Sequence, residues 1–313
     1  MIVESPFRPH WLLRSPHLQT LWPVWTRRTL PAGRKERLEL PDGDFLDLFW
    51  CDGGGPLVIV MHGLEGSINS HYAAAIMQAL QHNGFTGLFM HFRGCSGVPN
   101  RLARAYHSGE TGDFMRVLEY ATSTIGKPLH AAIGYSLGGN VLLKWLGEQG
   151  AEAPLGRAVA VSVPFRLAAA GQRLERGVSR IYQNHLMKKM RLGYKARFRV
   201  RPSPLDVDVD ALTTFRDFDD KVTAPLHGFS GADDYYGSCS SRQFLKAIEK
   251  PTLIIHAQDD PFMFPDTVPE ESELSPLVTL ELAKHGGHVG FIGGGLLPER
   301  WLEQRIIAYL GAA

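Results

Sequence analysis

The sequence predicts a doubly wound α/β fold, in which a mostly parallel sheet carries a helical cap insertion. Short apolar runs alternate with segments of helical character along most of the chain. The alternation stops between Phe165 and Pro251 and resumes after that gap. This pattern is typical of a parallel sheet that helices cover on both faces. The expected parts are an N-terminal arm at 1–30, a core at 31–165 and 250–313, and a helical cap at 166–249.

The first half of the core supplies its elements in a regular order. Two short strand patterns are separated by an Asp-Gly turn signal, which predicts a hairpin. The next apolar run, PLVIVMHG, has no polar alternation, so we expect a strand that is buried on both faces. The expected strands are 37–40, 45–50, 56–63, 86–92, 129–134 and 158–165, and the expected helices lie near 71–83, 109–125 and 137–149.

The remaining segments are less regular. Residues 1–30 are rich in Trp, Pro and Arg, and we interpret them as an irregular arm that lies on the body or over a pocket. Within the cap, the basic segment 188–201 is typical of a solvated helix face, with contact to a phosphate or a membrane as the less favoured alternative. After the cap we expect strands at 251–257 and 277–283 and a helix at 297–310.

Composition excludes several classes of protein. Among 313 residues, 33 Lys and Arg stand against 32 Asp and Glu, which gives a net charge of +1, and 44% are hydrophobic. Such a balance argues against a disordered chain and against a protein built to bind nucleic acid. No apolar stretch approaches the roughly 18 residues of a membrane helix, and the N-terminus has no apolar signal region. We therefore expect no integral membrane segment.

Cysteine usage points to a reducing compartment. Cys51, Cys95 and Cys239 are odd in number and widely spaced, so neither a disulfide framework nor a C-x-x-C zinc pattern is present. Reduced thiols in a cytoplasmic protein are the simplest interpretation. The oligomeric state stays open, with a monomer plausible.

The segment Gly134-Tyr135-Ser136-Leu137-Gly138 matches G-x-S-x-G and stands between an apolar strand and a helical pattern. This is the context that a nucleophile elbow requires, because a sharp strand-to-helix turn exposes the serine at the carboxyl edge of the sheet. The alternative is a chance glycine-rich turn. We predict Ser136 as a nucleophile at the N-terminus of a helix, whose dipole favours developing negative charge.

A second motif, His62-Gly63-Leu64-Glu65-Gly66, follows the strand at 56–63. In folds with such an elbow, this loop supplies one N–H group to the oxyanion hole and the residue after the nucleophile supplies the other. We therefore predict Leu64 and Leu137 as the two donors. His62 is expected to shape the loop rather than to act as a base.

The acid and the base are expected from the last two strand ends. Gln258-Asp259-Asp260-Pro261 follows one strand, and we choose Asp260 because the next proline fixes a turn, with Asp259 as the alternative. His285-Gly286-Gly287-His288 follows the other, and we choose His288 as the base over His285. The chain order Ser136, Asp260, His288 is that of α/β-hydrolases.

At this point the sequence resembles the YheT/EMB8-type branch of the α/β-hydrolases, which also includes animal ABHD proteins. The matching stretches are FRPHWLLRSPHLQTL, HGLEGS, HFRGCSG, YHSGETGDF, GYSLGGNVLLKWLGE, DDPF and HGGHVGF, and they cover nearly the whole chain. The resemblance implies a serine hydrolase that acts on acyl esters, with Ser136, Asp260 and His288 on the triad positions of the family. Animal relatives carry a membrane anchor, which we do not carry over to this chain.

Further polar and aromatic residues are open to two interpretations. Arg93, His107, Glu110 and Asp113 are expected to form a polar network that supports the elbow, or else to shape the pocket. Cys95 is not expected to be a nucleophile, because no second site partners it. The aromatic residues of the cap suit an acyl chain or pack the cap onto the body; they are Phe165, Tyr182, Phe198, Phe215, Phe229, Tyr235 and Tyr236.

The sequence therefore predicts a carboxylic ester hydrolase that works through an acyl-enzyme on Ser136. Its partner is a small-molecule acyl ester, and it needs neither a metal nor an organic cofactor, since no H-E-x-x-H pattern is present. One alternative is an acyltransferase, in which an alcohol replaces water in the second step. Others are a non-catalytic ligand-binding protein and a lyase or perhydrolase on the same scaffold.

Overall fold

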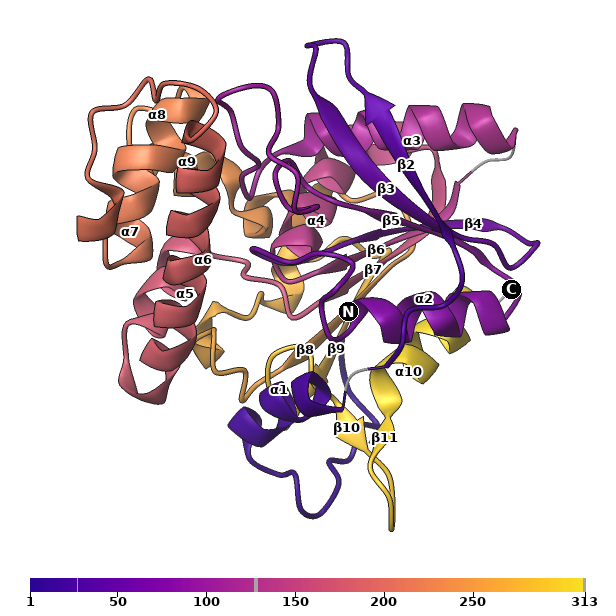
Figure 1. Cartoon of the computed structure of the whole chain (residues 1–313). Coiled ribbons are helices and arrows are strands. Elements are labelled where there is room, and N and C mark those ends of the chain that lie inside the picture. Colours follow the sequence, from indigo (N-terminus) through magenta and orange to yellow (C-terminus); the bar gives the residue numbers. More distant parts are fainter. Residues whose placement is uncertain (27, 127–128, 312–313) are drawn as a thin grey trace.

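The computed structural model describes residues 1–26, 28–126 and 129–311, and it confirms the α/β class. Its main sheet has nine strands in the order β1-β9-β8-β7-β6-β4-β5-β3-β2 (Figure 1). Neighbours from β1 to β5 in this order pair in parallel, whereas β3 pairs antiparallel with both β5 and β2. The strands are β1 (Ile2–Glu4), β2 (Arg34–Glu39), β3 (Phe45–Cys51), β4 (Leu57–Met61), β5 (Thr86–Met90), β6 (Leu129–Tyr135), β7 (Leu155–Val161), β8 (Thr252–Ala257) and β9 (Val278–Ala283).

Helices cover both faces of this sheet (Figure 1). Helices α3 (Thr111–Ile125) and α4 (Leu137–Gln149) lie on one face, and α2 (Ala73–His82) and α10 (Trp301–Leu310) lie on the other. Strand β4 accordingly divides its side chains between two cores. Ile59 and Met61 belong to the first core, and Val58 and Val60 belong to the second. The continuous apolar run of this strand is thus explained by burial on both faces.

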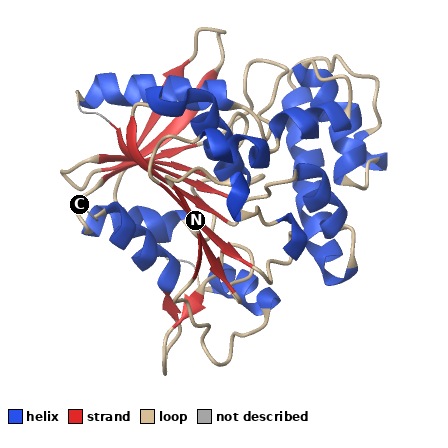
Figure 2. Ribbon diagram, turned by 180° about the vertical axis from the view of Figure 1, so that it is seen from behind, coloured by secondary structure: helices blue, strands red, loops and turns tan. Residues whose placement is uncertain are grey.

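The segment between β7 and β8 is helical, and we call it the cap. Figure 2 shows its helices gathered at one side of the sheet, apart from the helices that cover the sheet faces. A separate apolar cluster, which includes Leu174, Met187 and Phe215, holds the cap together. The cap helices are α5 (Leu167–Leu174), α6 (Arg180–Phe198), α7 (Phe215–Phe218), α8 (Ala224–His227) and α9 (Ala232–Cys239), with a π-helical turn at Asp219–Thr223 between α7 and α8.

The N-terminal arm is more ordered than its sequence predicts. Residues Ile2–Glu4 form β1, and Pro16–Trp25 form helix α1, so the expectation of an irregular arm is wrong for both segments. Pro16 stands in the first turn of α1, where its missing N–H costs nothing. The side chain of Gln19 is buried and donates to the carbonyls of Leu13 and Ile292, which fastens α1 to the body.

The C-terminal helix also begins later than expected. Instead of a helix from residue 297, the chain forms a small hairpin of β10 (Ile292–Gly293) and β11 (Glu299–Arg300) before α10 begins at Trp301. Pro298 disfavours helical backbone at residue 297, and the pairing of Glu299 and Arg300 with Gly293 and Ile292 delays the helix to Trp301. Within the described ranges, no helix is long and apolar enough to cross a membrane.

Candidate active site

Ser136 stands on a strained turn between β6 and α4. Its backbone has φ 51° and ψ −115°, a region that residues with a side chain rarely occupy. Two glycines make the turn possible. A Cβ on Gly134 would lie 2.4 Å from the carbonyl oxygen of Gly138, and a Cβ on Gly138 would lie 2.6 Å from the carbonyl oxygen of His62. The structure thus gives the G-x-S-x-G motif the tight strand-to-helix geometry that its sequence context predicts.

Ser136, His288 and Asp260 are joined by two contacts within hydrogen-bond distance, and His288 takes part in both. His288 Nε2 is 3.1 Å from Ser136 Oγ, and His288 Nδ1 is 2.8 Å from Asp260 Oδ2. Both Asp260 and His288 are buried, and Asp260 Oδ1 also accepts the N–H of Phe262 at 2.8 Å. With Nδ1–H donated to the carboxylate, Nε2 is left free to accept the proton of the serine hydroxyl.

Two contacts fix the position of His288. Its imidazole stacks on the ring of Phe262 with centroids 3.9 Å apart and an interplanar angle of 3°. Its backbone N–H donates to Thr20 Oγ1 at 3.0 Å, and the Thr20 hydroxyl donates in turn to the Pro16 carbonyl at 2.7 Å. The loop that carries the imidazole is therefore held by helix α1 of the arm.

The alternative acid and base form a separate pair. His285 Nδ1 is 3.1 Å from Asp259 Oδ2, and the N–H of Gly287 donates to Asp259 Oδ1 at 3.1 Å. Burial raises the pKa of Asp259. About half of the His285 side chain is exposed, and no contact joins it to Ser136 among the described residues. Asp259 therefore fastens the loop and is already occupied by its own partners.

The loop after β4 presents one N–H group without a partner. Gly63 N–H donates to the Tyr72 hydroxyl at 2.8 Å, and Glu65 N–H donates to the Tyr106 hydroxyl at 2.7 Å. Between them, Leu64 N–H has no acceptor in the described part of the protein. A donor that its neighbours leave unpaired beside a serine is available to a developing oxyanion.

Leu137 offers a second N–H group of this kind. It is the first residue of α4, where the backbone N–H has no acceptor inside the helix. The position directly after Ser136 places this N–H at the positive end of the α4 dipole. Leu64 and Leu137 both line the cavity described below, as does Ser136.

His62 shapes the loop that contains Leu64. Its Nδ1–H donates to the Gly63 carbonyl at 2.7 Å, and its Nε2 accepts the N–H of Phe92 at 3.0 Å. Complete burial lowers the pKa of His62 to about 3, so the ring stays neutral in this arrangement. These contacts agree with the loop-shaping role that the sequence predicts.

The expected polar network is present, and it includes further carboxylates. Buried Arg93 forms a bidentate pair with Asp113 and also contacts Asp42 and Asp44 in the β2–β3 turn. Glu110 pairs with Arg104, which lies 3.6 Å from Asp42 and so joins Glu110 to the group around Arg93. The sequence analysis did not include Asp42 and Asp44, because they precede Arg93 by about fifty residues and have no motif of their own.

Burial shifts the pKa values of His107 and Cys95. His107 Nε2 lies 3.5 Å from Glu110, and burial lowers the pKa of His107 to about 3. Burial also raises the pKa of the Cys95 thiol, which keeps it in the unreactive thiol form.

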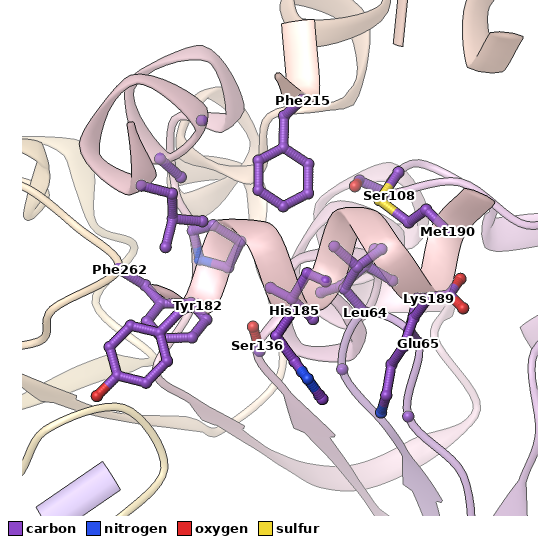
Figure 3. Close-up of a pocket in the computed structure, with 18 of the residues that line it drawn as sticks. Leu64, Glu65, Ser108, Ser136, Tyr182, His185, Lys189, Met190, Phe215 and Phe262 are labelled. Atoms are coloured by element: carbon purple, nitrogen blue, oxygen red, sulfur yellow. The ribbon is translucent and has the colours of Figure 1, made fainter. Parts of the chain in front are cut away.

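A cavity of about 610 Å³ lies over Ser136, between the core and the cap. Figure 3 shows Ser136 with Tyr182 and Phe262 to one side and with Leu64 and Glu65 to the other. Of the cap aromatics named above, Tyr182, Phe215, Tyr235 and Tyr236 line the cavity, whereas Phe165, Phe198 and Phe229 pack in apolar clusters. Helix α1 also contributes a wall, through His17, Thr20, Leu21 and Val24.

Helix α6 gives the cavity a polar stripe. His185, Lys189 and Arg197 recur at multiples of four residues, and all three line the cavity (Figure 3 labels the first two). Glu65 faces this stripe from the loop after β4 and accepts a hydrogen bond from the Tyr106 hydroxyl at 2.9 Å. Burial raises the pKa of Glu65, and the positive charges of Arg197 and Lys189 oppose that shift. The basic segment 188–201 is therefore partly turned toward the cavity.

The sequence analysis missed two residues that hold His288. Thr20 was counted with an irregular arm, and Phe262 was noted only within the stretch DDPF. Both lie in stretches that carry the family resemblance, which is the one sequence signal that marks them.

Comparisons with known proteins show the family and the fold of this chain. The family model described as "alpha/beta hydrolase fold" matches residues 56–294. YheT of Escherichia coli strain K12, which is named as an esterase, is 46% identical over 94% of this chain and 89% of its own. The mouse phospholipase ABHD3 is 28% identical over 94% of this chain and 75% of its own. Among solved structures, the Pyrococcus furiosus esterase Pf2001 matches with a TM-score of 0.60 at 17% identity, over 90% of this chain and 89% of that one.

Proposed function

The chain belongs to the α/β-hydrolase family, in the branch of YheT and EMB8, and from this premise we propose that it cleaves carboxylic acyl esters through an acyl-enzyme on Ser136. Relatives named as esterases and lipases support a hydrolase that acts on a small-molecule ester. The observation that carries the finer proposal is the 3.1 Å contact between His288 Nε2 and Ser136 Oγ, continued by the 2.8 Å contact to Asp260.

In the first step, Ser136 Oγ attacks the ester carbonyl carbon while His288 Nε2 takes the hydroxyl proton. Asp260 holds the imidazole in the tautomer with Nδ1–H and stabilises the cation that forms. The N–H groups of Leu64 and Leu137 donate to the oxyanion of the tetrahedral intermediate, and loss of one such donor typically costs about 10²–10³ in rate. The C–O bond to the alcohol then breaks, and His288 gives its proton to the leaving oxygen.

In the second step, His288 takes a proton from water, and the resulting hydroxide attacks the acyl carbon. The tetrahedral intermediate collapses, the bond to Ser136 Oγ breaks, and His288 returns the proton to the serine. An alcohol in place of water gives acyl transfer by the same route. Because both reactions share one acyl-enzyme, an acyltransferase is the second candidate.

The substrate is proposed to carry an apolar acyl chain or alcohol. The cavity walls contain apolar side chains from four helices, among them Val24, Leu174, Met190 and Phe215. A cavity of about 610 Å³ falls within the usual range of roughly 300–1,000 Å³ for small-molecule sites. We also propose a cytoplasmic location, because Cys51, Cys95 and Cys239 are free thiols.

Covalent labelling tests the acyl-enzyme. A fluorophosphonate probe is expected to label the wild-type chain and to leave Ser136→Ala unlabelled, with the thermal melt showing that both are folded. A folded wild-type chain that takes up no label would support the non-catalytic alternative. Mass spectrometry during turnover of a p-nitrophenyl ester should detect the acylated Ser136 peptide, whereas a lyase or perhydrolase would turn over without it. Comparison of hydrolysis with alcoholysis of the same ester decides between the hydrolase and the acyltransferase.

A further inference from the structure

Five large apolar side chains are exposed at one end of the molecule. Trp11 is 60% exposed, Leu12 58%, Trp25 64%, Leu296 89% and Leu297 73%. They come from the arm and from the loop of the β10–β11 hairpin, and we call them the apolar edge. Single exposed apolar residues need no explanation, but a group of them on adjacent segments marks an interaction surface.

Hydrogen bonds hold the two segments side by side. His10 N–H donates to the Ile292 carbonyl at 3.0 Å, and His10 Nε2 lies 3.4 Å from the Leu296 carbonyl oxygen. Gln19 donates to the Ile292 carbonyl at 2.9 Å and accepts the Ile292 N–H at 2.6 Å. Figures 1 and 2, which view the molecule from opposite sides, both place this loop and hairpin together at the same end. The apolar edge is therefore one surface rather than two separate ones.

Helix α1 connects this surface to the cavity, because it is apolar on two faces. Leu18, Trp22 and Trp25 follow a spacing of four and three residues, which puts them on one side of the helix. Leu18 and Trp25 on that side are exposed. Leu21 and Val24 lie on another side and line the cavity over Ser136.

The cap adds exposed apolar residues next to α1. Val178 and Ile181 line the cavity, yet they are 55% and 67% exposed, so they form part of its mouth. Tyr182, one residue further, contacts α1 through its hydroxyl, which is 3.0 Å from His17 Nδ1. The mouth of the cavity and the apolar edge are thus neighbours along α1.

The charge around the apolar edge is positive. Residues 5–35 contain no Asp or Glu. Arg8, Arg14 and Arg28 in this stretch are exposed, and none has a carboxylate within ion-pair distance among the described residues. Glu299, at the base of the hairpin, is an acid at the same end. Exposed Trp and Leu beside unpaired arginines have the composition of a protein surface that lies in the interface of an anionic membrane.

We propose that the apolar edge docks on a bilayer that contains anionic phospholipids, so that the substrate is an ester drawn from the membrane along helix α1 into the cavity. Trp11, Trp25 and the leucines enter the interface, where the amphipathic indole ring is favoured. The arginines contact lipid phosphates. The docking proposal depends only on the composition of the apolar edge and its surroundings. The proposed origin of the substrate depends in addition on the proposed function.

Vesicle binding by the full chain tests the docking. The wild type is expected to float with vesicles of phosphatidylcholine and phosphatidylglycerol, and to bind vesicles of phosphatidylcholine alone far more weakly. The variant Trp11→Ser/Leu296→Ser/Leu297→Ser should lower the partition coefficient about tenfold or more, because three apolar side chains lose their burial. Arg14→Glu should lower it about fivefold or more, and only on anionic vesicles.

A matched control removes exposed apolar side chains elsewhere. Leu192→Ser/Val200→Ser/Leu277→Ser changes three residues that are 56%, 65% and 46% exposed and lie outside the apolar edge. This variant should bind like the wild type. Equal loss of binding in both triple variants, or no binding of the wild type to anionic vesicles, would overturn the proposal. So would a stable dimer in sedimentation equilibrium that the apolar-edge variant abolishes, because a second copy would then cover the surface.

Two substrates separate this proposal from the proposed function. On p-nitrophenyl acetate in solution, the apolar-edge variant should keep the wild-type rate, since none of its three positions lines the cavity. On an acyl ester incorporated into anionic vesicles, its rate should drop in parallel with binding. A wild type that binds vesicles but hydrolyses neither ester refutes the proposed function and leaves the docking intact. Equal rates of wild type and variant on the vesicle ester refute the membrane origin of the substrate.

Discussion

The two walls of the cavity are built in different ways. The core wall carries Ser136, Leu64 and His288 on strand-end loops, and hydrogen bonds fix each of these loops at several points. The wall from the cap and the arm consists of helix faces that reach the cavity through side chains such as Met190 and Phe215. The difference indicates that the geometry of the reaction comes from short motifs, whereas the shape of the substrate site comes from packing between distant helices.

The largest effect is expected at the core wall, from Ser136→Ala. Removal of the nucleophile should lower kcat by about 10⁴–10⁶-fold, as in serine hydrolases with intact triads. The cap wall should remain, so the variant should still bind an apolar acid in the cavity. Steady-state rates on a p-nitrophenyl ester measure the loss of kcat. Calorimetry with the apolar acid measures whether the cavity still binds. A variant that keeps more than a tenth of the wild-type kcat would contradict the assignment.

Asp260→Asn should follow, with a loss of kcat near 10⁴-fold, because the amide favours the wrong tautomer of His288. Asp259→Asn provides the internal control. Asp259 is occupied by His285 and Gly287, so its replacement should change kcat by less than about tenfold. Rates of both variants on one ester decide the matter, and a reversed order of the two losses would assign the acid to Asp259.

Thr20→Val tests whether the arm positions the base. The variant loses the hydroxyl that accepts His288 N–H, which leaves a buried N–H unpaired and the loop less fixed, so kcat should drop about tenfold with little change in KM. Thr26→Val is the matched control, because the Thr26 hydroxyl also bonds a carbonyl four residues earlier in α1 but contacts no part of the site. Equal kcat losses in the two variants would mean that α1 stability alone matters.

Phe215→Ala tests the cap wall. The ring lines the cavity, and removal of a large buried side chain forfeits about 3 kcal/mol or more of packing, so the melting temperature should fall as well. Hydrolysis of an acetyl ester should stay within about threefold of wild type, whereas KM for a long-chain ester should rise about tenfold. A series of p-nitrophenyl esters measures this split. Equal losses along the series would show that the cap wall does not select the acyl chain.

The smallest effect concerns Asp219, which lines the cavity from the π-helical turn. Burial raises its pKa to about 6, although the hydroxyls of Thr223 and Tyr236 donate to the carboxyl at 2.7 and 2.8 Å. The folded chain therefore holds this proton more tightly than the unfolded chain, whose value is 3.8. The resulting stability is complete below about pH 4 and is lost as the pH rises through about 6.

Asp219→Asn should remove this pH dependence. The unfolding free energy of the wild type should decline between pH 4 and pH 7 relative to the variant, by at most about 3 kcal/mol. Denaturant titrations at several pH values measure the difference. Asp206→Asn is the control, since Asp206 is exposed, and its curve should run parallel to that of the wild type. A constant difference between wild type and Asp219→Asn across this range would refute the prediction.

The contrast between the two walls also explains which residues of the site can be predicted from the sequence. Ser136 follows β6 directly, and Asp260 and His288 lie three and five residues after the ends of β8 and β9. Because parallel strands end at one edge of the sheet, these local patterns bring the three residues to the same edge. Thr20 and Phe262 act on His288 through contacts that no local pattern encodes, and the Thr20 contact spans 268 residues. Helix α1 was missed for a local reason, because Pro16 and Pro23 interrupt its helical pattern.

The parallel pairing of β1 with β9 has a consequence for the order in which the protein assembles. Ile2 lies opposite Leu280, so β1 cannot pair with its neighbour in the sheet until β9 has been synthesised. Loop closure over such a separation is slow and comes late. Thr20 is tied to the same late event, because its partner His288 lies beyond β9. A nascent chain therefore contains the Ser136 turn long before it contains His288 and the Thr20 contact that holds it.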